Sequence, residues 1–125
     1  MDTQVKRKLG GGKRTEQPEP WKIEELVNAR GEKIVSRFIA TLQGRNSDEA
    51  KALLMVLAER GNDLGMPESK SLGQGLCELR GSELRIFCCF RPGRRIVLLD
   101  ALLKKRTDVP RDVVDRLRKL VKRIE

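Results

Sequence analysis

Apolar residues recur at helical spacing in the first half of the chain. One set lies at positions i, i+1, i+4, i+5 and i+8: Ile34, Val35, Phe38, Ile39 and Leu42. This stripe predicts a helix over residues 32–42 that Gly44 ends. Asn46 with Glu49 three residues later is typical of a helix start, and it predicts a second helix that ends before Gly61. The two helices are expected to form an antiparallel hairpin with their apolar residues in the core.

Short runs with turn residues between them predict strands on both sides of this helix pair. The stretch 21–27 alternates imperfectly before the Asn28–Gly31 turn, so it predicts a first strand. Three further runs are separated by Gly81-Ser82 and Pro92-Gly93: residues 76–80, 84–91 and 95–103. Runs of this length joined by tight turns predict a three-stranded antiparallel meander.

The middle run of the meander has two different faces. Leu84, Ile86, Cys88 and Phe90 share one face, and Arg85, Phe87, Cys89 and Arg91 share the other. The second face therefore mixes apolar bulk with positive charge, which is the first indication of a functional surface. The third run is almost continuously apolar, as in a strand covered on both faces, and Asp100 interrupts it. Asp100 is expected either to pair with an arginine across the sheet or to act as a general base.

The last segment predicts an amphipathic helix. It begins near Pro110, and its apolar stripe consists of Val113, Val114, Leu117, Leu120, Val121 and Ile124. The opposite face is basic, as a solvated helix face often is. The predicted fold class is therefore α+β, in the order β-α-α-β-β-β-α, over a domain of residues 21–125. Residues 1–20, rich in glycine, proline and charge, are expected to form a flexible basic tail.

Net charge is distributed unevenly along this order of elements. The whole chain carries +9, and residues 80–125 hold fourteen basic and six acidic residues. A field of that sign attracts polyanions, and nucleic acid is the abundant polyanion of the cytosol. The alternative is a surface whose charge only keeps the protein soluble.

Other features of the composition narrow the class of protein. Cys77, Cys88 and Cys89 are too few for a disulfide framework, and the chain contains no histidine and no C-x-x-C spacing. We therefore expect a reducing compartment, no metal site and no cofactor. No apolar run has the length of a signal peptide core or of a membrane span, so a cytoplasmic protein is expected.

Five short sequence motifs (words) in the second half of the chain resemble those of the RelE/HigB superfamily of toxin-antitoxin toxins, in its phage-derived HigB-like branch. They are LGMP at 64–67, GLCELR at 75–80, LRIF at 84–87, RIVLL at 95–99 and LKK at 103–105, the last followed by VP at 109–110. Each word alone is weak, but five in the right order with matching spacing are fairly specific. The resemblance extends over residues 21–125.

The resemblance implies an activity and a set of partners. Members of the superfamily are mRNA interferases that usually act on messages in the ribosomal A site, and a cognate antitoxin, here expected to carry a helix-turn-helix, neutralises each of them. DNA would be contacted only through that antitoxin. The implied chemistry is metal-independent: a ribose 2′-hydroxyl attacks the adjacent phosphate. It requires a base, an acid and cations around the phosphorus.

The family's motif residues correspond to particular positions of this chain. The motif arginines fall on Arg80 and Arg85, which are the expected phosphate ligands, and Arg85→Ala is expected to abolish toxicity without unfolding the protein. The paired lysines after the last strand fall on Lys104 and Lys105, either of which is expected to exchange a proton. Three arginines around the last hairpin are expected to steer RNA or the ribosome: Arg91, Arg94 and Arg95. Each of the seven also fits an ordinary surface position.

The departures from the family pattern concern aromatic residues. The chain has no tyrosine, and the family's tyrosine and histidine positions hold Cys77, Leu84 and the stretch 100–102. Stacking on a base contributes roughly 1–3 kcal/mol, so its loss weakens substrate capture. The alternative reading is therefore a catalytically weak or inactive module that binds RNA, the ribosome or a DNA-bound antitoxin. A structural protein of a phage is a third reading.

Overall fold

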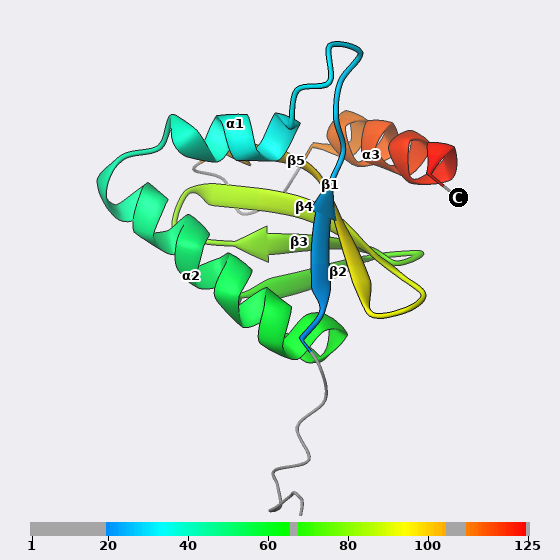
Figure 1. The fold of residues 1–125 in the computed structure, drawn as a ribbon, viewed down its shortest axis with the longest axis horizontal. Helices are drawn as coiled ribbons and strands as arrows, with labels where there is room; N and C mark the ends of the chain where they lie inside the picture. The colour runs from blue at the N-terminus through cyan, green and yellow to red at the C-terminus, as the bar shows by residue number, and fades with distance from the viewer. Residues whose placement is uncertain (1–19, 66–67, 105–109, 125) are drawn as a thin grey trace, which may run out of the picture.

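The computed structural model describes residues 20–65, 68–104 and 110–124 (Figure 1). Its elements, in chain order, are β1 (Lys22–Glu25), α1 (Ile34–Ala40), α2 (Gly44–Arg60), the short 3-10 helix η1 (Gly61–Asp63), β2 (Ser69–Gly73), β3 (Leu76–Arg80), β4 (Leu84–Arg91), β5 (Arg95–Leu103) and α3 (Arg111–Arg123). This arrangement confirms the α+β class. The predicted tail, apart from Pro20, lies outside the described residues, so it stays a prediction.

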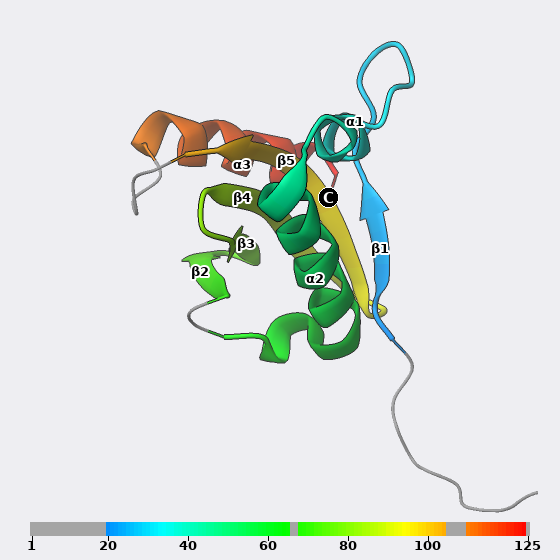
Figure 2. The same cartoon turned by 90° about the vertical axis from the view of Figure 1, so that its left-hand side faces the viewer.

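The strands form one sheet in the order β1-β5-β4-β3-β2. β1 pairs with β5 in parallel, and the other neighbours are antiparallel. Helices α1 and α2 follow one another over one face of the sheet, and α3 lies on the other face (Figures 1 and 2). The chain thus builds three layers, with the sheet in the middle and a separate apolar cluster on each side of it.

Strand β2 is the element that the sequence pattern did not predict. The meander has four strands because Ser69–Gly73 adds to β3 at the edge of the sheet. Its sequence, SKSLG, contains one large apolar residue, so it lacks the alternation that identifies a strand. Hydrogen bonds to β3 satisfy the backbone groups that point toward that strand. As an edge strand, β2 has no neighbour on its other side, and edge strands often carry polar residues.

The start of α2 also differs from the prediction. The helix begins at Gly44, two residues before the expected cap Asn46, and Gln43 occupies the N-cap position. Glu49, expected to close a capping box, instead accepts hydrogen bonds from the backbone N–H (2.9 Å) and the hydroxyl (2.7 Å) of Ser82. Its carboxylate therefore ties α2 to the β3–β4 turn, a contact between residues far apart in the sequence.

The two faces of β4 are confirmed as predicted. Leu84, Ile86 and Cys88 belong to the apolar cluster under α1 and α2, whereas Phe87 and Cys89 belong to the cluster under α3. All three cysteines are buried and free of disulfides.

A bulge shifts the pairing of β5, because Phe87 pairs with Asp100 while Cys88 pairs with Leu98. The additional residue turns Asp100 toward α3, where its carboxylate pairs with Arg116 at 2.8 Å. Of its two expected roles, Asp100 shows pairing with an arginine, although the partner comes from a helix. No helix in the described part of the chain is long and apolar enough to cross a membrane.

Candidate functional site

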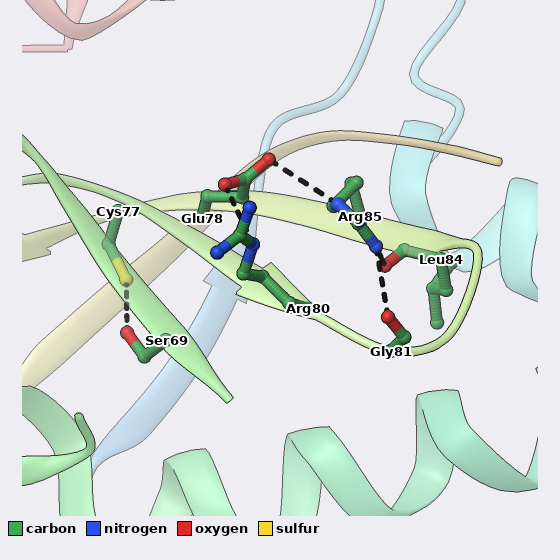
Figure 3. A network of polar contacts seen from close by, with 7 residues as sticks. All are labelled: Ser69, Cys77, Glu78, Arg80, Gly81, Leu84 and Arg85. Carbon is green, nitrogen blue, oxygen red and sulfur yellow. Dashed lines mark hydrogen bonds and ion pairs between the residues drawn. The ribbon is translucent and has the colours of Figure 1, made fainter. Parts of the chain in front are cut away.

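Three charged residues of β3 and β4 converge on the α3 side of the sheet. Arg80 and Arg85 lie directly opposite one another, and Glu78 precedes Arg80 by two residues, so strand alternation gives all three the same face. Oε1 of Glu78 lies 3.4 Å from Nε of Arg80, and Oε2 lies 3.6 Å from Nε of Arg85 (Figure 3). The Glu78 side chain is 1% exposed, against 16% for Arg80 and 5% for Arg85. One buried carboxylate therefore bridges two arginines.

Arg85 has further partners in the turn that joins the two strands. Its Nη1 atom donates to the carbonyl oxygens of Gly81 and Leu84, both at 2.9 Å (Figure 3). The guanidinium group is thus held by the turn on one side and faces Glu78 on the other. This position differs from that of an exposed phosphate ligand, because Arg85 also stabilises the β3–β4 turn.

Two lysines complete the charge around Glu78. Burial raises the pKa of this carboxyl, and the charges of Arg80, Arg85, Lys70 and Lys104 act in the opposite direction. Lys70 lies directly opposite Glu78 in β2, and Lys104 follows the end of β5. We call these five residues the Glu78 cluster. Four cations around a single carboxylate give the cluster a net charge of +3, so it suits a phosphate of a polyanion.

A pocket of about 490 Å³ borders the cluster at the β3–β4 turn. Its lining comes from α2, the segment before β2, the facing ends of β3 and β4, and the turn between them: Glu49, Ala52, Leu53, Glu68, Arg80, Gly81, Ser82 and Arg85. The hydrogen bonds from Ser82 lower the pKa of Glu49, so this carboxylate is already engaged. Glu68 is the second carboxylate that lines the pocket, together with Arg80 and Arg85.

The three arginines of the last hairpin lie elsewhere. Arg85 and Arg91 are at opposite ends of β4, and six residues of strand span about 20 Å. Arg95 pairs with Glu24 through two nitrogens, at 2.8 and 3.2 Å. Arg94 stacks over Trp21, with its Cζ 4.9 Å from the ring centroid. The structure therefore brings together Arg80, Arg85 and Lys104, and it separates them from Arg91, Arg94 and Arg95. Lys105 lies outside the described residues.

Cys77 belongs to the other face of the sheet. Its Sγ lies 3.0 Å from Oγ of Ser69 on the side of α2, away from Glu78 and the arginines (Figure 3). A hydrogen bond with Cys88 lowers the pKa of Cys77 and raises that of Cys88. A thiolate at Cys77 is thus separated by the sheet from Arg85. Within the described ranges, no three Cys, Asp or Glu side chains gather as metal ligands.

Three residues of this region have no predicted role in the sequence pattern. Glu78 was recognised only as part of a motif, although a glutamate between Cys77 and Leu79 in a buried strand indicates a paired carboxylate. Lys70 lies in the strand that was not predicted, so its register opposite Glu78 had no signal in the sequence. Glu68 enters the pocket through the fold of the segment before β2.

Comparison with known proteins places the chain in a family. The model of the phage derived protein Gp49-like family matches residues 37–122. A search of curated proteins found no significant match. Among solved structures, the crystal structure of the toxin-antitoxin complex RelBE2 from Mycobacterium tuberculosis has a chain that is 13% identical, with a TM-score of 0.44 over 74% of this chain and 100% of that one. By its match over residues 37–122, this chain belongs to the Gp49-like phage-derived proteins, a RelE/toxin-like family, and the recognition made from its sequence words is confirmed.

Proposed function

We propose that this protein is the toxin of a type II toxin-antitoxin system and that it cleaves mRNA on the ribosome. The Glu78 cluster carries the proposal, because four cations meet beside a pocket that also contains a carboxylate. Such an arrangement suits phosphoryl chemistry, in which negative charge develops on the oxygens around phosphorus. Membership of a RelE/toxin-like family supports the same conclusion.

The proposed reaction is a transesterification. The ribose O2′ attacks the adjacent phosphorus, the bond from phosphorus to O5′ breaks, and the products are a 2′,3′-cyclic phosphate and a 5′-hydroxyl. A base takes the O2′ proton, and an acid gives a proton to O5′. Water is not consumed in this step, and no electron transfer occurs. Cations that contact the phosphate oxygens lower the barrier most when they are already in place.

Residues of the cluster and the pocket supply these groups. Arg80, more exposed than Arg85, is the proposed phosphate ligand, and Arg85 contributes charge from its fixed position. We assign Glu68 as the proposed base, because it lines the pocket with both arginines. Lys104 is the proposed proton donor to O5′, and Lys105 is kept as a second candidate for that role. We assign Arg91, Arg94 and Arg95 to a separate contact with RNA or the ribosome.

The proposed partners follow from this activity. The substrate is mRNA held in the ribosomal A site, and the inhibitor is a cognate antitoxin, expected to contain a helix-turn-helix. We expect its gene next to that of this chain, and DNA is contacted only through it. The proposed reaction requires no metal and no cofactor, and the proposed location is the cytoplasm.

A second candidate function is an inactive binding module for RNA, the ribosome or a DNA-bound antitoxin. The observation that favours it is the absence of tyrosine and histidine from the whole sequence. Stacking of a base on an aromatic ring contributes roughly 1–3 kcal/mol, and this chain has few rings to offer. The module would keep its cationic surface and bind RNA without cleaving it.

Inducible expression in a bacterium tests the proposal. We expect growth arrest and new 5′ ends inside translated codons, both of which Arg80→Ala removes. Arg80 is the better target, because Arg85 also stabilises the turn. Glu24→Gln serves as the control, because it removes the carboxylate that pairs with Arg95, far from the β3–β4 turn. Normal growth with intact mRNA, at verified soluble expression, would reject the toxin and favour the binding module.

A further inference from the structure

Glu78 is buried too deeply to react with RNA itself. Its side chain is 1% exposed and lies in the middle of β3, between the buried residues Cys77 and Leu79. A group that accepts a proton from a ribose must come within hydrogen-bond distance of it. The position of Glu78 therefore argues against a direct role, and its contribution must act through its neighbours.

Arg80 and Arg85 need a negative charge between them, because they lie directly opposite each other on β3 and β4. Like charges directly opposite on adjacent strands repel. Glu78 places one oxygen toward the Nε of Arg80 and the other toward the Nε of Arg85 (Figure 3). At 3.6 Å the contact between Glu78 and Arg85 is an ion pair longer than a hydrogen bond, so Glu78 acts on this guanidinium group through charge while the turn holds its Nη1 atom.

Burial makes this arrangement sensitive to charge. A carboxylate removed from water is costly unless cations compensate it, and the same holds for the nearly buried Arg85. The pairs at 3.4 and 3.6 Å are therefore mutually dependent, and the loss of one charge disturbs both guanidinium groups. An exposed pair, such as Glu24 with Arg95, lacks this dependence because water replaces either partner.

We propose that Glu78 is a positioning residue for the cleavage reaction: its buried carboxylate fixes the guanidinium groups of Arg80 and Arg85 in the orientation that meets the reacting phosphate. The inference rests on the proposed function for its catalytic part. Its structural part, the orientation of the two arginines, is independent of any activity. Glu78 thus serves as an internal anion between two cations that otherwise repel.

Two readouts on Glu78→Gln separate these parts. Glutamine keeps the shape and one acceptor oxygen but loses the charge. The first readout is the side-chain Nε–H signals of Arg80 and Arg85 in the NMR spectrum of the full chain, assigned with Arg80→Lys and Arg85→Lys. We expect both signals to lose their dispersion and to exchange faster with water. Glu24→Gln is the matched control and leaves both signals unchanged.

The second readout is cleavage of mRNA on programmed ribosomes. We expect kcat to fall about 10- to 100-fold, since small misplacements of catalytic groups cost factors of this size. KM is expected to change less than about threefold, because the four cations of the cluster stay present. Glu78→Asp, which keeps the charge on a shorter side chain, is expected to retain an intermediate kcat. It also replaces Glu78→Gln if that variant does not fold.

Each outcome decides one part. Unchanged arginine signals in a folded Glu78→Gln protein would overturn the positioning role, whatever the activity. A fall in rate that equals the loss of folded protein, as measured by circular dichroism, would show that Glu78 only stabilises the fold. A wild-type chain that cleaves nothing would overturn the proposed function. If its arginine signals still collapse in Glu78→Gln, the structural part of the inference holds and the two arginines are oriented for binding alone.

Discussion

The two ends of strand β4 carry the same kind of residue in different surroundings. At one end, Arg85 and Arg80 share the buried carboxylate of Glu78. At the other end, Arg95 pairs with the exposed carboxylate of Glu24, and Arg94 stacks over Trp21. At both ends an arginine pairs with a glutamate in the folded chain. Burial distinguishes them, because it decides how strongly each charge depends on its partner.

This difference identifies the end at which a ligand has the larger effect. Exposed pairs exchange with water and salt, so a phosphate there gains little beyond attraction. Around Glu78, two of the four cations, Arg80 and Arg85, are largely withdrawn from water, and a second anion there balances charge that solvent screens poorly. A site for phosphoryl chemistry is therefore expected at the β3–β4 turn, and a surface for electrostatic attraction at the β4–β5 hairpin. The following substitutions test that division, from the largest expected effect to the smallest.

Arg85→Ala is expected to have the largest effect on stability. It leaves Glu78 buried with one cation fewer and removes two hydrogen bonds to the turn. Removing one partner of a buried ion pair typically costs about 3–5 kcal/mol of unfolding free energy. Urea unfolding followed by circular dichroism measures it. The expectation from sequence is that this variant loses toxicity without unfolding, and the same measurement shows whether the folded state tolerates the loss of stability.

The double variant Glu78→Leu/Arg85→Leu serves as the control for that experiment. It removes both charges at once, so we expect it to be more stable than Arg85→Ala. If Arg85→Ala unfolds at the same urea midpoint as the wild type, the buried Glu78–Arg85 pair stabilises the fold no more than an exposed pair does. The contrast between the two ends of β4 would then be wrong.

Gly61→Ala tests whether the packing of Trp21, the ring under Arg94, stabilises the β4–β5 hairpin end of the sheet. A Cβ at Gly61 would lie 2.1 Å from atoms of the Trp21 ring, and the φ of Gly61 is +53°. Overpacking of this kind costs about 1–3 kcal/mol, and the backbone conformation adds to it. Urea unfolding measures the loss, and the fluorescence of Trp21, the single tryptophan, reports whether its ring moves.

Gly31→Ala is the matched control, because Gly31 has a φ of +79° but no atom within 4 Å of the added Cβ. The difference between the two variants isolates the contact with Trp21. Equal losses of stability would mean that the Trp21 ring adapts, and that backbone strain alone explains the effect.

The fold was largely predictable from particular residues. The apolar stripes that contain Val35 and Leu57 predict helices α1 and α2. The alternation along β4 assigns Ile86 and Phe87 to opposite faces of the sheet. The edge strand β2 was not predictable, because its residues are polar and only pairing with β3 makes them a strand. The bulge in β5 was also hidden, although it decides that Asp100 faces α3.

The candidate site was predictable only in part. Arg80, Arg85 and Lys104 were found from motif words, and they do surround one point. That point is Glu78, whose importance depends on burial, and burial is a property of the folded chain. Arg91, Arg94 and Arg95 are predicted to steer RNA or the ribosome, a role separate from that of the motif residues, and the eight-residue strand β4 separates Arg91 from Arg85.

The pKa values of Glu78 and Glu24 provide a subtler test. Burial raises the pKa of Glu78 above the ordinary 4.5 despite its two arginines, and the hydrogen bond with Arg95 lowers that of Glu24 below it. A ¹³C NMR titration of the carboxyl groups is expected to show midpoints on opposite sides of 4.5. Because the pKa of Glu78 is raised in the folded state, its protonated form contributes to the free energy of unfolding below pH 4.5. This contribution is lost as the pH rises through the folded pKa. The lowered value means that the Glu24 contribution is present above pH 4.5 and is lost as the pH falls. Midpoints on the same side would show that burial does not separate the two glutamates.

Arg95→Ala is expected to have the smallest effect. Arg95 and Glu24 are both well exposed, so water replaces their contact, and salt screens what attraction remains. We expect the urea midpoint to stay within the error of the measurement at physiological salt, and the rate of any mRNA cleavage to stay unchanged at saturating substrate. A fall in association rate that disappears at high salt is still expected, because Arg95 contributes to the field that attracts a polyanion. A large loss of stability would mean that the Glu24–Arg95 pair secures β1 to β5, and a loss of cleavage that persists at saturating substrate and high salt would place the hairpin in the site itself.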